Sequence, residues 1–188
     1  ANGCTGTRES QTITVYDPVK LDFEVQPEVC GNNWVHFNYK GTGGGGIVMW
    51  NYGDGSYSDG MGSHRYQQEG VYNVTLMMAA QGACGDTITK NSIIKVKGPF
   101  TRINSITNTC DGERNLVTFN DGTTDAEKWT WTFGDGNTTS YTSFQPSITH
   151  AYAESGFYSV QLTAEKDGCA VRLLEDSVAY VTRKSRPV

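Results

Sequence analysis

The side chains that most often carry catalysis near neutral pH are scarce, because the 188-residue chain contains 3 histidines and 5 cysteines. The histidines are His36, His64 and His150, and the last two each lie two residues before a tyrosine. His64 and His150 therefore occupy the same place in a repeated pattern, and a single active site is rarely assembled from identical halves of separate domains. We therefore expect His64 and His150 to hydrogen-bond within the fold, and we expect a chain that is not an enzyme and has no catalytic residues.

Four of the 5 cysteines recur as two pairs with similar spacing, which indicates an internal repeat. Cys30 matches Cys110 by position, and Cys84 matches Cys169, which leaves Cys4 over. This spacing predicts one disulfide within each repeat, Cys30–Cys84 and Cys110–Cys169. Zinc binding is the competing use of cysteine, but no C-x-x-C spacing or Cys/His cluster indicates it. Disulfides predict an oxidising setting, so we expect an extracellular protein at the cell surface or secreted.

Two further patterns resemble ligand-binding sites. Residues 41–46 match G-x-G-x-x-G, but residues 47–50 read as a strand where a dinucleotide fingerprint needs a helix, which favours a flexible hairpin loop over a nucleotide site. Asp121 and Asp125 supply two carboxylates without a visible third. We expect no cofactor, with a weak calcium site near Asp121 and Asp125 as the alternative to solvated loop carboxylates.

Composition and charge argue against nucleic-acid binding and membrane insertion. The chain has 15 Lys and Arg against 20 Asp and Glu, a net charge of −5, so it lacks the basic surface of a nucleic-acid binder. No apolar run approaches the ~20 residues of a membrane-spanning helix, so we expect no membrane insertion. The 22 glycines favour many turns, and 37% hydrophobic residues supply a core.

An internal repeat organises the chain. Residues 50–55 (WNYGDG) recur as residues 131–136 (WTFGDG), and each is followed by H-x-Y and then by G-x-Y-x-V-x-L. The shared positions are expected to determine the fold. They are Trp50, Gly53, Asp54, Gly55, His64, Tyr66 and Tyr72 in the first copy, and Trp131, Gly134, Asp135, Gly136, His150, Tyr152 and Tyr158 in the second.

The repeat predicts the domain boundaries. Residues 17–97 and 98–182 form the two copies. Residues 1–16 resemble the last strand of a copy and are expected to belong to a preceding, truncated domain. Residues 183–188 are expected to be a linker to a following domain, so the sequence reads as part of a longer tandem array.

Within each copy the hydrophobic period is two. Residues 72–76, 158–164 and 129–133 alternate apolar and polar side chains, and Gly-rich turns separate such segments. This pattern is typical of strands with one buried and one solvated face. It predicts an all-β fold of antiparallel β-sandwiches.

Both copies resemble the PKD (polycystic kidney disease) domain, whose hallmark is W-x-F-G-D-G followed by H-x-Y and G-x-Y-x-V-x-L. The second copy matches throughout, and the first has Tyr52 in place of Phe. The resemblance covers about residues 18–181 and implies an immunoglobulin-like sandwich of the outer cell surface. Tandem arrays with added cysteines look like those of giant bacterial adhesins, including cargo of the type IX secretion system used in gliding motility.

The motif also has a physical interpretation. A tryptophan buries the most area of any side chain and is expected between the sheets at positions 50 and 131. Gly53-Asp54-Gly55 is expected to form a tight turn in which Asp54 caps its own backbone. Gly70-Val71-Tyr72 resembles the tyrosine corner of immunoglobulin-like sandwiches.

These features predict a non-catalytic structural or adhesive module, a stiff spacer and interaction surface within a cell-surface filament. Pro18 and Pro99 each follow the last strand of a copy by about three residues, a short linker stiffened by proline. The expected partners are neighbouring domains of the same long chain, with surface polysaccharide or other proteins as further candidates.

The alternative hypothesis is a carbohydrate-binding accessory module of a secreted hydrolase. It requires exposed aromatic rings that stack on sugars. The candidates by position are Trp34, Tyr57, Tyr141 and Phe144, but they do not fall at equivalent repeat positions.

Overall fold

The computed structural model describes residue 12 and residues 19–42, 46–60, 62–79, 85–111 and 114–181. The predictions for residues 1–16 and 183–188 lie outside the described residues, apart from Thr12. The described residues form strands, turns and loops without a helix, which confirms the all-β prediction. Accordingly, they include no helix of the length and hydropathy that crossing a membrane requires.

The first module runs from β1 to β9. Its strands are β1 (Phe23–Glu24), β2 (Glu28–Cys30), β3 (Val35–His36), β4 (Asn38–Tyr39), β5 (Ile47–Asn51), β6 (Tyr57–Asp59), β7 (Ser63–His64), β8 (Gly70–Ala79) and β9 (Asp86–Lys97). One sheet has the order β2-β9-β8-β5-β6, and the pairs β1-β4 and β3-β7 lie apart from it. All pairings are antiparallel except β2 with β9, which places Cys30 opposite Lys97 at the end of the module.

The second module runs from β10 to β16. Its strands are β10 (Ile103–Asp111), β11 (Arg114–Asp121), β12 (Lys128–Thr132), β13 (Thr138–Tyr141), β14 (Ser147–Tyr152), β15 (Gly156–Lys166) and β16 (Cys169–Val181). They form two antiparallel sheets of order β10-β11-β14 and β13-β12-β15-β16. This is the two-layer arrangement that the alternating sequence predicts.

Each module has its own hydrophobic core around the repeated tryptophan. Trp50 is 1% exposed, and its ring meets Phe23 edge-on at 5.1 Å between centroids. Trp131 is fully buried and packs against Phe119 at 5.3 Å. The two clusters share no residue, so each module has a core of its own.

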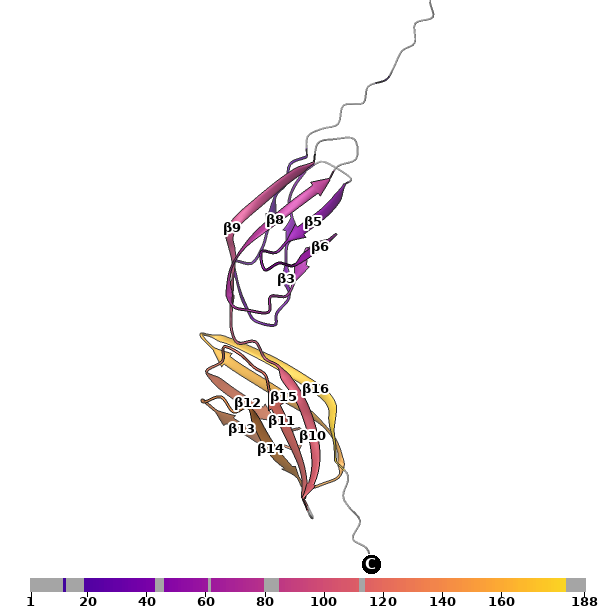
Figure 1. Cartoon of the computed structure of the whole chain (residues 1–188), viewed down its shortest axis with the longest axis vertical. Helices are drawn as coiled ribbons and strands as arrows, with labels where there is room; N and C mark the ends of the chain where they lie inside the picture. Colours follow the sequence, from indigo (N-terminus) through magenta and orange to yellow (C-terminus); the bar gives the residue numbers. More distant parts are fainter. Residues whose placement is uncertain are drawn as a thin grey trace, which may run out of the picture.

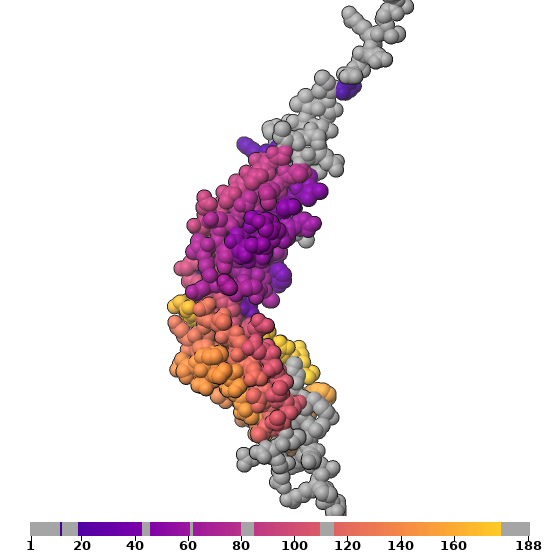
Figure 2. Space-filling model, viewed as in Figure 1, coloured from indigo at the N-terminus to yellow at the C-terminus, as the bar shows by residue number. Residues whose placement is uncertain are grey.

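The two sandwiches lie end to end (Figure 1). They meet at a narrow junction, where yellow atoms from the β15–β16 region of the second module touch the first module (Figure 2). The chain passes from one module to the other through Gly98–Pro99, a cis peptide bond.

Candidate functional site at the junction between the modules

The Gly-Asp-Gly turn of each repeat is held by its own aspartate. Gly53 and Gly55 have φ values of +84° and +92°, a region that glycine adopts without steric cost. Between them, Asp54 Oδ1 accepts a 2.9 Å hydrogen bond from the backbone N–H of Ser56. The second module has the same turn at residues 134–136. The turn therefore has a structural role in both modules.

The second oxygen of each turn aspartate contacts the repeated histidine. Asp54 Oδ2 lies 2.7 Å from His64 Nε2, and Asp135 Oδ2 lies 2.7 Å from His150 Nε2. Burial alone would raise the pKa of both carboxyls, but these hydrogen bonds and those from backbone N–H groups lower it below its usual value. The His64 ring also stacks on Tyr52 at 4.2 Å. Both histidines thus connect the turn to the aromatic core.

The hydroxyls of the repeated tyrosines donate hydrogen bonds to backbone carbonyls. The Tyr66 hydroxyl donates to the carbonyl of Tyr52 at 2.9 Å, and the Tyr72 hydroxyl donates to the carbonyl of Gln68 at 2.9 Å. The second bond, to the residue four positions earlier, is the geometry of a tyrosine corner. The second module makes the same two bonds, from Tyr152 to Phe133 and from Tyr158 to Glu154.

The two candidate calcium ligands have different partners. Asp121 is buried, and its Oδ1 accepts a 2.7 Å hydrogen bond from the backbone N–H of Thr123. Burial raises the pKa of the Asp121 carboxyl, although the hydrogen bonds from Thr123 oppose this. Asp125 Oδ1 lies 3.9 Å from Lys166 Nζ. No group of three or more metal-ligating side chains occurs among the described residues, so calcium here stays a prediction.

The cysteine pairing expected from the repeat is wrong. Cys30 of the first module is bonded to Cys169 of the second, across a sequence separation of 139 residues. Neither Cys30–Cys84 nor Cys110–Cys169 forms. Cys84 lies outside the described residues, and the side chain of Cys110 is not described.

The reason is geometric. Cys30 pairs with Lys97, the last residue of β9, whereas the β8–β9 connection that carries Cys84 precedes Asp86, the first residue of β9. A strand of that length spans about 35 Å at ~3.3 Å per residue. A disulfide needs Cα atoms within about 7 Å, so residues at opposite ends of one sandwich cannot be bridged. Cys30 instead faces the β15–β16 turn of the next module, where Cys169 lies.

Further contacts surround the bridge. The Asn32 side chain donates a 2.7 Å hydrogen bond to the carbonyl of Thr101 in the second module. Phe100, beyond the predicted boundary at residue 97, is 7% exposed and belongs to the core of the first module. Lys166 Nζ lies 3.5 Å from Glu69 across the junction. Sequence reasoning missed these three contacts, which make the junction a packed joint.

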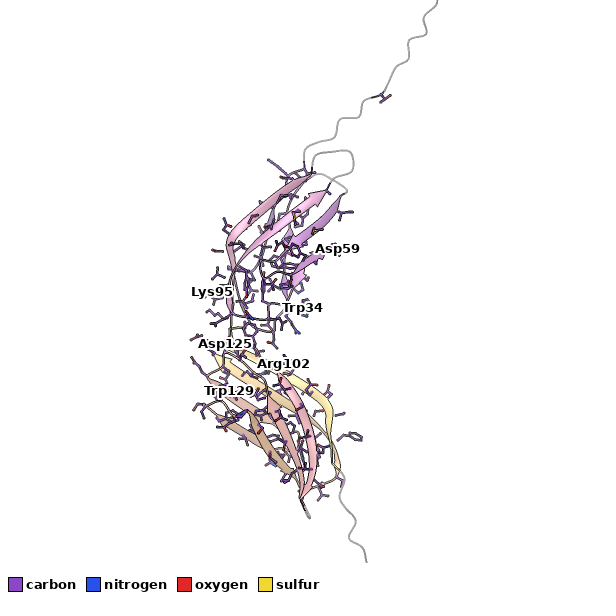
Figure 3. The ribbon with its side chains drawn as sticks, viewed as in Figure 1. Trp34, Asp59, Lys95, Arg102, Asp125 and Trp129 are labelled. Atoms are coloured by element: carbon purple, nitrogen blue, oxygen red, sulfur yellow. A yellow bond between two sulfur atoms is a disulfide. The ribbon has the colours of Figure 1, made fainter. Side chains whose placement is uncertain are left out.

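Trp34 is the most prominent aromatic residue near the junction. It lies at the end of the first module that faces Arg102 and Asp125 of the second (Figure 3). Its side chain is 59% exposed and borders a groove that also contains the Cys30–Cys169 bridge. The guanidinium carbon of Arg65 lies 5.5 Å from the centre of the Trp34 ring. The arginine therefore occupies a position near this ring that a stacking sugar would need.

The other three aromatic candidates lie elsewhere. Tyr57 is 62% exposed on β6 of the first module. Tyr141 accepts a 2.8 Å hydrogen bond from the indole N–H of Trp131, and its ring stacks on Trp129 at 5.8 Å. Phe144 packs 6.0 Å from the same Trp129 ring. Tyr141 is therefore part of the packing of the second module, whereas Phe144 is 49% exposed and stays an exposed aromatic candidate.

Two consecutive sandwiches, antiparallel except for the β2–β9 pair and each with a tyrosine corner, define an immunoglobulin-like tandem β-sandwich protein. The sequence profile of the PKD domain matches residues 17–96 and 97–179, and the chain belongs to this family. The resemblance inferred from the repeat motifs is thus confirmed.

Comparison with solved structures returned immunoglobulin-like proteins. The chicken interferon gamma receptor alpha chain is 10% identical, with 86% of this chain and 99% of that chain covered and a TM-score of 0.34. The amphioxus IgVJ-C2 molecule is 13% identical, with 81% and 99% covered and a TM-score of 0.28. The search of curated proteins found no match.

The family and the Cys30–Cys169 bridge indicate the class of protein and the compartment in which it works. PKD and immunoglobulin-like folds are typically non-catalytic structural or adhesion modules. A disulfide in such a protein points to an extracellular or secreted setting, because thiols stay reduced in most cytosols.

Proposed function

We propose that the chain is a stiff spacer segment of an extracellular adhesin array, in which consecutive PKD domains are held at a fixed angle. The observation that supports it most directly is the Cys30–Cys169 bond, which gives the two modules a second covalent connection beside the peptide linker. Extracellular adhesin is the specific role that we infer from this connection and from the family.

A single linker allows two bodies to twist and to bend about it. Here the linker leaves the first module after Lys97, and the disulfide leaves it from Cys30, which pairs with Lys97. On the second module, the chain enters at Phe100 and the sulfur bridge enters at Cys169. Two adjacent connections define a single hinge axis, so twisting about the linker is prevented and one bending direction remains.

The remaining direction is restrained by non-covalent contacts. Burial of the Phe100 ring in the first module would be lost on bending, as would the hydrogen bond from Asn32 to Thr101. The exposed Lys166–Glu69 pair adds little, because surface ion pairs contribute about 0–1 kcal/mol. The joint is therefore stiff because of its covalent and apolar contacts.

Small-angle X-ray scattering tests the spacer. A compact domain of 188 residues has a radius of gyration of about 16 Å. Two sandwiches of about 35 Å placed end to end give a value above about 20 Å. We expect the larger value for the oxidised chain, and a broader distance distribution when Cys30→Ser and Cys169→Ser are combined. A value near that of a compact globule, or an unchanged distribution in the double variant, would contradict the proposal.

Retention on insoluble polysaccharides distinguishes the alternative function. The spacer does not require binding, and we expect no retention of the wild-type chain. Retention that is lost in Trp34→Ala but kept in Tyr57→Ala would favour the carbohydrate-binding module, because Tyr57 is equally exposed and lies away from the groove.

A further inference from the structure

We propose that the Cys30–Cys169 bridge is an exchange site for thiols, at which a small dithiol attacks Cys30 Sγ while both modules stay folded. The bond is then a latch between the modules that opens on reduction and closes again on oxidation. Its consequence for stiffness rests on the spacer function proposed above, whereas its reactivity rests on the geometry of the bridge alone.

The bridge lies outside both hydrophobic cores. Among the described residues that form the two clusters, around Trp50 and around Trp131, neither Cys30 nor Cys169 occurs. A disulfide enclosed in a core is reached by a reductant only after that core opens. Here the bond joins one module to the other, so its reduction does not require either core to open.

A groove gives solvent access to the bond. It has a volume of about 470 Å³, and both cysteines line it together with the exposed side chain of Trp34. Cys30 is partly exposed, whereas Cys169 is 6% exposed. In thiol–disulfide exchange a thiolate attacks one sulfur and expels the other, and access helps to decide which sulfur is attacked. The more accessible Cys30 is therefore the site of attack, and Cys169 is the leaving group.

A hydrogen-bond relay runs beside the bridge and connects the two segments that carry the cysteines. The side chain of Asn32, two residues after Cys30, donates a 2.7 Å hydrogen bond to the carbonyl of Thr101. The Thr101 hydroxyl donates a 3.2 Å hydrogen bond to the carbonyl of Val171, two residues after Cys169. Thr101 is 3% exposed, and hydrogen bonds away from water are electrostatically stronger. The relay therefore keeps the two sulfurs close to each other after the bond between them is broken.

The ring of Phe100 supports the relay from the first module. It is buried in the core of that module and directly precedes Thr101, so the middle of the relay is anchored on both sides of the junction. Two groups that a folded structure holds together react with each other at a high effective concentration. The bridge is thus expected to form again when an oxidant replaces the reductant.

The reduction takes place in two steps. A thiolate of the dithiol attacks Cys30 Sγ and forms a mixed disulfide, and Cys169 leaves as a thiolate that takes up a proton. The second thiol of the reactant then loses its proton and attacks the reactant's own sulfur in the mixed disulfide. Cys30 leaves as a thiolate and is protonated, and the reactant leaves as a disulfide. In total, two electrons and two protons pass from the dithiol to the two cysteines.

Reduction of the folded chain tests whether unfolding is needed. Free thiols are first blocked with N-ethylmaleimide, and dithiothreitol is then added. Thiols that appear at Cys30 and Cys169 are labelled with iodoacetamide and located by peptide mass spectrometry. We expect a rate proportional to the dithiothreitol concentration and unchanged by urea below the unfolding transitions, with the circular dichroism of the folded chain retained. A rate that is independent of dithiothreitol, or that rises with urea in step with unfolding, would overturn the proposal.

A monothiol identifies the sulfur that is attacked. When the reaction with 2-mercaptoethanol is quenched in acid at an early stage, we expect the adduct on Cys30 and a free thiol at Cys169. An adduct mainly on Cys169 would refute the assignment. Trp34→Ala removes the side chain at the edge of the groove and is expected to raise the rate, whereas Tyr57→Ala is the matched control for an exposed aromatic residue away from it. Equal rates in these two variants would contradict access through the groove.

Thr101→Val tests the relay, because it removes the hydroxyl and nearly preserves the shape of the side chain. In a glutathione redox buffer, the ratio of oxidised to reduced bridge measures the effective concentration of the two thiols. Loss of a hydrogen bond of typical strength predicts a decrease of about fivefold in this ratio. Thr118→Val is the matched control, because its hydroxyl contacts Thr149 on the outer face of the second module. An unchanged ratio in Thr101→Val would refute the positioning role of the relay.

The exchange site and the spacer function can fail separately. The labelling experiments follow the chemistry of Cys30 and Cys169, whereas small-angle scattering follows the relative motion of the modules. If the bridge exchanges in the folded chain but the distance distribution is the same before and after reduction, the exchange site stands and the spacer function is wrong. If the bridge resists reduction until the chain unfolds, the exchange site is wrong and the spacer function stands.

Discussion

Removal of the Cys30–Cys169 bond gives the sharpest test of how the modules are coupled. We consider Cys30→Ser, Cys169→Ser and the double variant, compared with the oxidised chain. A bridge within each module and a bridge between modules predict opposite patterns, so the three proteins discriminate between them.

The expected loss of stability follows from the length of the loop that the Cys30–Cys169 bond closes. When the first module unfolds and the second stays folded, the free segment runs from Cys30 to the linker, roughly 70 residues. When the second module unfolds, the free segment from the linker to Cys169 has a similar length. The chain-entropy model gives about 4 kcal/mol for a loop of this size. One bond is thus expected to stabilise each of the two modules by about 4 kcal/mol.

Urea denaturation measures the free energy of unfolding, and hydrogen exchange read by mass spectrometry assigns each transition to its module. We expect each single variant to destabilise both modules, each by about 4 kcal/mol. We expect the double variant to lose no more than either single variant, because the second substitution removes a bond that is already absent. Reduction of the wild-type chain should reproduce the same loss.

The opposite result would refute the reasoning. If Cys30→Ser destabilised only the first module and Cys169→Ser only the second, each cysteine would be bonded within its own module. Additive losses in the double variant would lead to the same conclusion.

Three further predictions concern the modules themselves. Gly55→Ala is expected to lower the free energy of unfolding by about 1–2 kcal/mol, because residue 55 has a positive φ. Gly53→Ala is expected to lower it more, since the new Cβ would also collide with the carbonyl of Asn73. Equal losses for the two variants in urea denaturation would contradict this. The pKa of Asp54 is lowered in the folded state, so its contribution to stability is present above about pH 4 and is lost as the pH falls through the folded-state pKa. Asp54→Asn should therefore reduce the acid dependence of unfolding, and an unchanged slope would be evidence against the Asp54–His64 contact. The pKa of Asp121 is raised by burial, so the contribution of this carboxyl to stability is lost as the pH rises through its folded-state pKa. Asp121→Asn should therefore stabilise the chain at pH 7 but not in acid. Destabilisation at pH 7 would instead argue for a bound cation.

The features that the sequence predicted correctly are local. The Gly-Asp-Gly turn, the capping by Asp54 and the bond from Tyr72 to Gln68 each involve residues at most four positions apart. Turn chemistry and hydrogen bonds over such distances depend on residue type and spacing alone. Repetition of the same residues in a second copy made these predictions firmer.

The cysteine pairing was not predictable in the same way. Repeat positions show which cysteines are equivalent, but they do not show at which end of a sandwich each one lies. That depends on the parallel pairing of β2 with β9, a long-range contact that sets Cys30 beside Lys97. The hydrogen bond from Asn32 to Thr101 spans 69 residues and has no local signal either.

The position of the bond matters for a protein under tension. A bridge within one module shortens the segment that the module releases when it unfolds, but it leaves the joint to its neighbour free to bend. The Cys30–Cys169 bond instead encloses most of both modules in a loop with a sequence separation of 139 residues. At about 3.6 Å per residue, that loop withholds roughly 500 Å of extension from a force applied at the two ends. The bond that leaves the joint a single bending direction therefore also limits how far the chain can be extended, and a spacer that must hold a binding partner at a set distance needs both properties.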